Sequence, residues 1–412
     1  MTNLLWPGDQ RAGELMSDAA LLAAMVAVES AWLDALVAAG LAPDECAGAD
    51  LTGLVSAGDR EELAVESEDG GNPVIGLVAL LRDRASAEVS RWIHRGLTSQ
   101  DVVDTGLMLA SRAVIDELIA QLAEQISALS VLAATHRGTP MAARTLTQYA
   151  VPSTFGVKAA TWLNGVVDAY RQISALTIPV QIGGAGGTLA ATTELAVLAG
   201  RANGAGIALE MVQNVAVTLG LNARTPWHTT RGPVTAIGDA FTGCTDAWGR
   251  IASDVVTLAR PEIAELSEPA GGGRGGSSSM PQKRNPVLSI LIRRAAISAP
   301  PLAATLHTAA ALANDERPDG AWHAEWDTLR SLARRTVVAG SQCSELLARL
   351  EVHSAQMAKN LESASAVNDV LGEQRVIAEL VGKAPSGNYF GAIDALIDDS
   401  LERAARILKE HP

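Results

Sequence analysis

The sequence predicts an all-α protein, an elongated subunit with a long central helical bundle. In the 412-residue chain, apolar residues recur at every third or fourth position over long stretches, which is the period of a helix. We find no convincing run of alternating polar and apolar residues, the pattern typical of half-buried strands. The core must be aliphatic, because aromatic residues make up 3% of the chain whereas the hydrophobic class reaches 48%. The many alanines let helices approach closely.

The longest expected helix runs from Thr105 to Arg137. This stretch has no proline, and Gly106 is its only glycine. About 30 residues, each rising ~1.5 Å, give a helix of ~45 Å, which suits a long bundle. Its apolar face is formed by Val114, Leu118, Leu122, Ile126, Leu129 and Leu132. The same period predicts helices over residues 10–40, Phe155–Ile173, Leu189–Leu219, Pro233–Leu258 and Thr328–Leu350.

Clusters of helix-breaking residues suggest a division of the chain into three regions. We expect an N-terminal helical domain over residues 1–105 and a central long-helix bundle over residues 106–350. A small helical domain over residues 351–412 would complete the chain.

The charge balance excludes one class of function and leaves another open. The chain has 32 Lys and Arg against 46 Asp and Glu, so its formal charge is −14. A general nucleic-acid binder needs a basic face, so no nucleic-acid partner is expected. A small anionic substrate is compatible with this charge, because a local cationic pocket suffices. With 19% charged and 48% hydrophobic residues, the chain is also not expected to be disordered.

The cysteines and the apolar stretches favour a soluble cytoplasmic protein. The three cysteines, Cys46, Cys244 and Cys343, are far apart and form neither a disulfide framework nor a CxxC metal clip. The start of the sequence lacks the pattern of a secretory signal. Two uncharged stretches, over residues 172–193 and 295–314, are interrupted by Gly, Pro and polar residues, so no membrane partner is expected.

A first segment with chemical character is Gly271–Val287, which reads GGGRGGSSSMPQKRNPV. Its composition alone is compatible with a disordered linker. However, Lys283 and Asn285 stand at its base, directly before an apolar helix. A Gly/Ser loop with such residues is typical of a lid that closes over an anion.

Two further segments carry neutral polar side chains at expected helix starts. Thr98, Ser99 and Gln100 precede the longest helix, where Thr and Ser are also common capping residues. The positive end of a helix dipole at that place also suits a carboxylate. The segment Arg144–Gly156 holds Arg144, Thr145 and Gln148; its alternative interpretation is a loop leading into a helix, with Pro152 and Thr154 as start signals.

Other motifs are excluded. The GGAGG run at Gly183–Gly187 lacks the GxGxxG spacing of a dinucleotide site. None of the seven histidines pair at i, i+3 or i+4, so no helical metal site is expected, and there is no GxSxG elbow. We therefore predict no metal and no cofactor.

Taken together, these segments resemble the fumarase/aspartase superfamily. Its signature GSSxMPxKxNP matches Gly276–Pro286, and the TSxD and RTxxQxAxPxTFG segments follow in the family order at Thr98–Asp101 and Arg144–Gly156. The resemblance covers about residues 10–350. It implies an all-α fold and a homotetramer whose active sites combine segments of three subunits.

Within the superfamily, the chain looks most like the bacterial 3-carboxy-cis,cis-muconate cycloisomerases. Many superfamily lyases have an acid/base His where this chain has Leu146, and the cycloisomerases also lack it. Trp322 and Trp326 stand where adenylosuccinate lyases hold the nucleotide with Ser and Arg. The segments that carry this likeness are Gly71–Val74, His94–Asp101, Gly183–Ala191, Pro226–Arg231 and Gly320–Trp326.

The resemblance implies a reaction and roles for individual residues. The reaction would interconvert 3-carboxy-cis,cis-muconate and 4-carboxymuconolactone, in the protocatechuate branch of the β-ketoadipate pathway. Ser277 matches the proposed general base, and Lys283 and Asn285 would hold the developing dianion. His94 is a candidate for proton relay or binding, with a structural role as the alternative. The expected ligands of the substrate carboxylates are Thr98, Ser99, Gln100, Arg144, Thr145, Gln148 and Arg317.

Two other functions stay open. One is a lyase that releases fumarate from an amino or nitro dicarboxylate, for example an adenylosuccinate lyase-like enzyme. The other is a non-catalytic structural member of the superfamily, although Ser277, Lys283 and Asn285 are all intact. The sequence identifies neither the exact carboxylated substrate nor the general acid.

Overall fold

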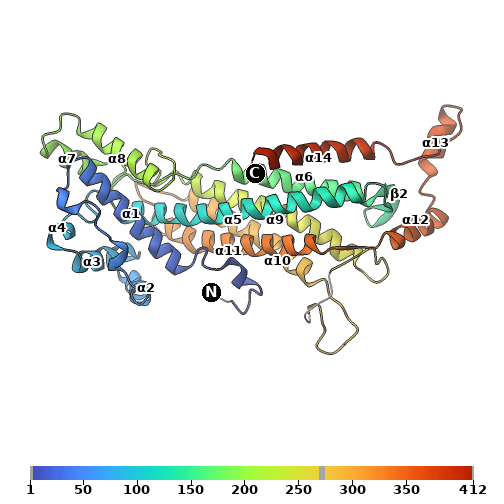
Figure 1. The fold of residues 1–412 in the computed structure, drawn as a ribbon, viewed down its shortest axis with the longest axis horizontal. Coiled ribbons are helices and arrows are strands. Elements are labelled where there is room, and N and C mark those ends of the chain that lie inside the picture. Colours follow the sequence, from blue (N-terminus) through green and yellow to red (C-terminus); the bar gives the residue numbers. More distant parts are fainter. Residues whose placement is uncertain (1–2, 269–273, 411–412) are drawn as a thin grey trace. The chain divides into compact units, whose positions relative to one another are not determined.

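The computed structural model describes residues 3–268 and 274–410, and its helices confirm the all-α fold (Figure 1). Gly271–Gly273, at the start of the expected lid, lie outside the described residues. The helices are α1 (Asp18–Ala38), α2 (Asp59–Gly70), α3 (Val74–Arg84), α4 (Ala87–Ser90), α5 (Ser99–Thr135), α6 (Phe155–Ser174), α7 (Ala190–Leu198), α8 (Gly204–Thr218), α9 (Gly232–Leu258), α10 (Val287–Ala311), α11 (Ala321–Ala348), α12 (Ser354–Asn368), α13 (Gly372–Leu380) and α14 (Ile393–Glu410). Short 3₁₀ turns lie at Asp9–Ala12, Asp44–Cys46 and Thr52–Leu54.

The chain forms two compact units. Unit 1 comprises Met1–Asp116, Ala175–Asp239 and Pro301–Arg335; unit 2 comprises Glu117–Ser174, Ala240–Pro300 and Thr336–Pro412. The long helices α5, α9, α10 and α11 each contribute residues to both units. The three-domain division expected from the sequence stays a prediction.

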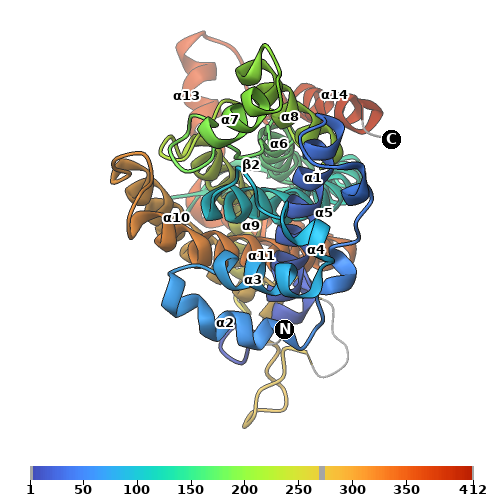
Figure 2. The same ribbon diagram turned by 90° about the vertical axis from the view of Figure 1, so that its left-hand side faces the viewer.

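In unit 1, the short helices α2, α3 and α4 gather near α1 (Figure 2). Ser17 begins α1 by accepting a hydrogen bond from the Ala20 amide at 3.1 Å. The α1 face that packs inward includes Trp32 and Leu36, both 0% exposed. The expected helix over residues 10–40 therefore divides into a 3₁₀ turn and α1.

In unit 2, α14 packs along α6 (Figure 1). Ala133 of α5, Ala159 and Ala160 of α6 and Ile397 of α14 form a buried cluster. A Cβ at Gly249 of α9 would lie 2.5 Å from Cβ of Ala296 on α10. Small residues thus permit close helix packing in this unit, as the composition predicts.

One expected helix is wrong in its extent. The stretch Leu189–Leu219 is two helices, α7 and α8, rather than one. Gly200, with a φ of +76°, ends the first helix. Asn203 begins the second, because its side chain accepts a hydrogen bond from the Gly206 amide at 3.0 Å.

The structure also has two small strand pairs that no alternating pattern in the sequence indicates, and the alternative interpretation of Arg144–Gly156 as a simple loop before α6 is wrong. Strands β1 (Pro140–Thr145) and β2 (Gln148–Thr154) pair antiparallel, and a second small pair joins β3 (Leu266–Ser267) to β4 (Glu351–Val352). The two-residue connection of the β1–β2 hairpin is Leu146 and Thr147, with φ angles of +48° and +74°. Such turns favour Asn-Gly, so this sequence does not signal the hairpin.

By length and composition alone, α1, α5 and α10 are each apolar enough to cross a membrane. The absence of a membrane partner therefore stays a prediction.

All three cysteines are free and buried, and burial raises the pKa of the Cys244 thiol to about 12.

Candidate active site

The predicted site residues fall into two groups, one in each unit. His94, Thr98, Ser99, Gln100 and Arg317 belong to unit 1. Arg144, Thr145, Gln148, Ser277, Lys283 and Asn285 belong to unit 2.

In unit 1, the start of α5 holds three of the predicted ligands. Thr98 and Ser99 are half-buried, and the guanidinium of the exposed Arg317 donates to Oγ1 of Thr98. Gln100, in contrast, is 0% exposed: its amide nitrogen donates to Asp104 at 3.1 Å and to the carbonyl of His228 at 3.0 Å. Its Oε1 has no hydrogen-bond partner among the described residues. Direct contact of Gln100 with substrate stays a prediction.

Asp101 organises the loop that carries the Gly183–Gly187 run. Its buried carboxylate accepts hydrogen bonds from the amides of Gly183 and Gly184, both at 2.9 Å, and from the amide of Thr98 at 3.0 Å. The His228 ring contacts the same carboxylate, with Nε2 3.1 Å from Oδ1. A Cβ at Gly183 would lie 2.6 Å from Cε1 of His228, so only glycine fits there. The GGAGG run is therefore a packing feature at this site.

A buried ionic cluster lies one turn further along α5. Arg231, with a fully buried side chain, donates to Asp104 at 2.7 and 3.0 Å and to Glu325 at 2.6 Å. Burial lowers the pKa of Arg231, but the two carboxylates raise it by more. Burial raises the pKa of Glu325, and Arg231 offsets only part of that effect. The indole of Trp322 completes the cluster by donating to Asp104 at 2.9 Å.

These contacts join the segments that carry the likeness to the cycloisomerases. Residues 94–101, 183–191, 226–231 and 320–326 meet through Asp101, Asp104 and Arg231. Since the charges are paired inside the unit, they fix the position of the start of α5, and the loss of one partner would leave another charge buried without its pair.

In unit 2, the β1–β2 hairpin presents its residues at the surface. Thr145 and Gln148 are exposed. Arg144 instead forms a bidentate ion pair with the buried Glu265, at 2.7 and 3.0 Å. Burial lowers the pKa of Arg144, but Glu265 raises this pKa by more. The guanidinium also stacks over Tyr149 at 5.1 Å. A role of Arg144 as a substrate ligand stays a prediction.

The signature loop, Gly276–Pro286, carries the groups that could take part in catalysis. Ser277 is half-buried, and its Oγ accepts hydrogen bonds from the amides of Met280 at 3.2 Å and Ser279 at 3.4 Å. Donors of this kind stabilise negative charge on the hydroxyl oxygen. Lys283 is exposed and has no ion pair among the described residues, whereas Asn285 is tied to the Gly275 carbonyl through its amide at 2.8 Å and its side chain at 3.1 Å.

The helix after this loop has its N-terminus already occupied. Glu268 accepts hydrogen bonds from the amides of Leu288 at 3.0 Å and Ser289 at 2.7 Å. The carboxylate therefore offsets the positive end of the α10 dipole. These two amides are therefore not free to bind an anion, and a role of Lys283 in holding one stays a prediction.

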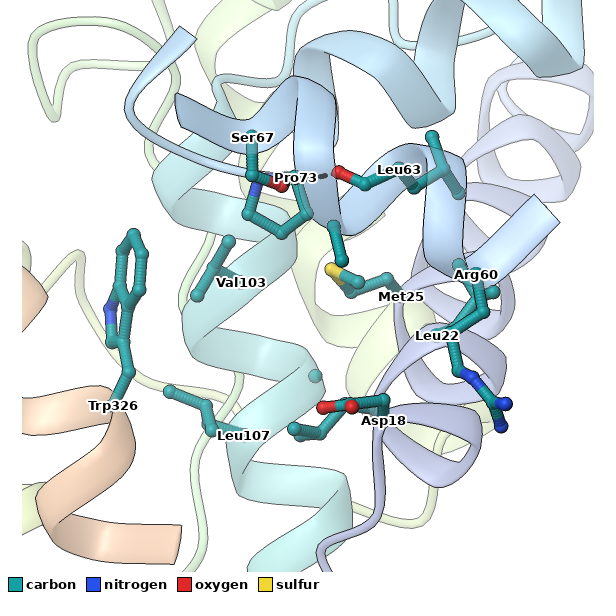
Figure 3. A pocket seen from close by; sticks show the side chains of 13 residues that line it. Asp18, Leu22, Met25, Arg60, Leu63, Ser67, Pro73, Val103, Leu107 and Trp326 are labelled. Carbon is teal, nitrogen blue, oxygen red and sulfur yellow. Dashed lines mark hydrogen bonds between the residues drawn. The ribbon is translucent and has the colours of Figure 1, made fainter. Parts of the chain in front are cut away.

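A cavity in unit 1 differs in character from both groups. It measures about 300 Å³ and is mainly apolar, with Met25, Leu63, Val103 and Leu107 in its wall and Trp326 at one side (Figure 3). The residues that line it include none of the predicted site residues.

Within residues 3–268 and 274–410, no group of three or more His, Cys, Asp or Glu could hold a metal ion.

Comparison with known proteins identifies the family. A family model described as Lyase matches residues 35–300. The chain belongs to this lyase family. This lyase is 44% identical over 384 residues to nitrosuccinate lyase from Streptomyces davaonensis, covering 90% of this chain and 78% of that protein. It is 37% identical over 382 residues to 3-carboxy-cis,cis-muconate cycloisomerase from Bradyrhizobium diazoefficiens, covering 91% and 82%.

A solved structure supports the same assignment. The 3-carboxy-cis,cis-muconate lactonizing enzyme from Pseudomonas putida matches this lyase with a TM-score of 0.80 and 30% identity, over 96% of this chain and 97% of that one. The resemblance to the fumarase/aspartase superfamily is thus confirmed, and this lyase is an enzyme of that superfamily.

Sequence reasoning missed several residues that contact the predicted site residues. Glu29, which contacts His94, and Glu265, which pairs with Arg144, gave no signal because a lone acidic residue in a helix or loop is usually solvated. The Asp104–Arg231–Glu325 cluster had a usable signal. Arg231 and Glu325 both lie in segments singled out for their likeness to the cycloisomerases.

Proposed function

We propose that this lyase eliminates a weakly basic leaving group from a small dicarboxylate, with nitrosuccinate as the first substrate to test. The observation that carries the proposal is the 44% identity to a nitrosuccinate lyase, in a chain that keeps Ser277 and Lys283 of the signature loop. The active enzyme is proposed to be a cytoplasmic homotetramer with shared sites.

In the proposed reaction, Ser277 removes the proton from C3, the carbon next to one carboxylate of nitrosuccinate. The C3–H electron pair forms the C2=C3 double bond as the C2–N bond breaks, which gives fumarate and nitrite. The carboxylate next to C3 carries extra negative charge on the way. Lys283 and Asn285 would stabilise this charge, and one well-placed donor is worth about 3 kcal/mol.

Ser277 requires help to act as a base, because a hydroxyl is a weak one. The amides of Ser279 and Met280 already point at its oxygen. Together with the positive charge of Lys283, they would stabilise the alkoxide. This arrangement supports the assignment of the base.

The hairpin tip supports a leaving group that departs without a proton. Leu146, where many superfamily lyases have an acid/base His, is 97% exposed. A leaving nitrogen that is not already protonated, such as the purine amine of adenylosuccinate, needs an acid to leave, whereas a carboxylate with a pKa of about 4 leaves unaided. Nitrite is similarly weakly basic. The Leu146 position thus favours nitrite or carboxylate over such a nitrogen.

Cycloisomerisation of 3-carboxy-cis,cis-muconate is the second candidate. In the reverse direction it removes a proton next to a carboxylate and expels a carboxylate, so it uses the same groups. The 37% identity to a cycloisomerase and the TM-score of 0.80 to a lactonizing enzyme favour it.

A substrate panel tests the proposal. The purified protein is incubated separately with nitrosuccinate, 3-carboxy-cis,cis-muconate, aspartate and adenylosuccinate. We expect fumarate and nitrite in equal amounts from nitrosuccinate, detected by ultraviolet absorbance and by diazo coupling. Turnover of aspartate or adenylosuccinate without turnover of nitrosuccinate would contradict the proposal, and lactone formation alone would favour the second candidate.

A further inference from the structure

The imidazole of His94 lies against a buried glutamate. Nδ1 of His94 is 2.6 Å from Oε1 of Glu29 on α1, and the Glu29 side chain is 0% exposed. The second carboxylate oxygen, Oε2, is buried without a hydrogen-bond partner among the described residues. The ring is therefore the main polar partner of this carboxylate.

The backbone around His94 is held from both sides. Nη2 of Arg82 donates to the carbonyl of Ile93 at 2.8 Å, and the indole of Trp32 donates to the carbonyl of Arg95 at 2.6 Å. Trp32 follows Glu29 by one helical turn, so α1 contacts both the ring and the loop.

His94 itself adopts a strained backbone conformation, with a φ of +63°. For a residue other than glycine this costs about 1–3 kcal/mol and persists only where the surroundings fix it. Such strain is concentrated at functional sites. The contacts from Glu29, Arg82 and Trp32 are the fixing surroundings here.

We propose that Glu29 is a positioning residue: it accepts the Nδ1–H of His94 and leaves Nε2 as the ring nitrogen that meets the substrate. The inference rests on the proposed function for the identity of the substrate. A carboxylate is only an acceptor, so a neutral ring bonded to it carries its proton on Nδ1. Nε2 then has a lone pair to offer.

The remaining ring nitrogen is available for this role. Nε2 of His94 has no hydrogen bond among residues 3–268 and 274–410, and the side chain is 17% exposed. His228 differs, because its Nε2 is bonded to Asp101 inside the unit and its side chain is 5% exposed. Of the two, only His94 presents an unbonded Nε2 from a partly open position.

The substitution Glu29→Gln tests the assignment. The amide is nearly isosteric, and with its NH₂ turned toward the ring it donates to Nδ1 and moves the ring proton to Nε2. Nitrogen and carbon NMR shifts of the His94 ring, assigned by comparison with His94→Asn, report this tautomer. We expect Nδ1–H in the wild type and Nε2–H in the variant. The kcat for nitrosuccinate should fall roughly 100-fold, with a smaller change in KM, because Nε2 then carries a proton and no longer offers its lone pair to the substrate.

Asp59→Asn is the matched control, because Asp59 is also a buried carboxylate of unit 1 but pairs with Arg84. It should leave the His94 tautomer unchanged. A wild-type ring protonated on Nε2 would overturn the proposal even if E29Q folds poorly, as would an E29Q protein whose ring proton moves to Nε2 without a fall in kcat. If the wild type turns over neither nitrosuccinate nor carboxymuconate, the proposed function fails, while the spectrum still decides the role of Glu29.

Discussion

The buried ionic cluster of unit 1 and the signature loop of unit 2 use their charged residues in different ways. In unit 1, Asp101, Asp104, Arg231 and Glu325 are buried and bonded to one another or to the chain around them. In unit 2, the signature loop exposes Lys283 without an ion pair among the described residues, and Ser277 is bonded only through its own loop amides.

This difference distinguishes residues that hold the fold in place from residues that could react with a substrate. Buried, paired charges cannot respond to a substrate without breaking their pairs, so they fix geometry. Unpaired groups near solvent are free to bind an anion or exchange a proton. We therefore expect substitutions in the unit 1 cluster to reduce stability first and substitutions in the loop to reduce activity first.

The largest effect on stability is expected from Arg231→Met. It leaves Asp104 and Glu325 facing each other without their cation, and the loss of one partner of a buried pair costs about 3–5 kcal/mol. Urea unfolding measures this loss. Arg84→Met is the control, because Arg84 pairs with Asp59 but its side chain is 40% exposed, so a smaller loss is expected. Equal losses in the two variants would remove the distinction.

Lys283→Met should affect activity instead. Removing the cation that stabilises the developing dianion should lower kcat/KM about 100-fold, or about 2.7 kcal/mol, with the unfolding free energy unchanged. The adjacent Arg284 provides the control, because among the described residues it donates only to carbonyls of its own loop. Arg284→Met should change kcat/KM by no more than about twofold. A large effect of both substitutions would point to general electrostatic attraction.

Glu265→Gln is expected to lower both the stability and the activity, each to a moderate extent. It weakens the hold on Arg144 and so loosens the hairpin that presents Thr145 and Gln148. A disturbed buried hydrogen bond costs about 1–3 kcal/mol of stability, and KM should rise more than kcat falls. Glu262→Gln, at an exposed position in the same segment, should do neither. An unchanged KM for Glu265→Gln would separate the hairpin from substrate binding.

The smallest expected effect is on the pH dependence of stability. Hydrogen bonds from Arg84, and then from Ser56, hold the pKa of Asp59 well below its usual value. A depressed pKa contributes stability above the unfolded value of about 3.9, and that contribution is lost as the pH falls below it. In Asp59→Asn, the unfolding midpoint should therefore fall less steeply as the pH is lowered from about 5 to about 3. An identical slope in the variant would show that Asp59 does not contribute.

The sequence predicted the helices closely. The face from Val114 to Leu129 is buried as its spacing requires, and α5, α6 and α9 begin or end within a few residues of their predicted positions, apart from the α5 start. Periodicity reports burial, which is what determines these helices.

The contacts within the site depend on long-range packing and could not be predicted. The pairs Glu29–His94 and Arg144–Glu265 join residues 65 and 121 positions apart. The β1–β2 hairpin was hidden because Leu146 and Thr147 occupy a turn that usually contains Asn-Gly. The signature loop was found because its motif is contiguous in the sequence.

The most direct test of the central claim is the activity of Ser277→Ala, measured with its unfolding free energy on the same preparation. The account predicts that nitrite and fumarate release from nitrosuccinate falls at least about 1,000-fold, because the base is lost, while the unfolding free energy and the oligomer are unchanged. Unchanged turnover in this variant would contradict the assignment of the base and the distinction between residues that hold the fold in place and residues that could react with a substrate.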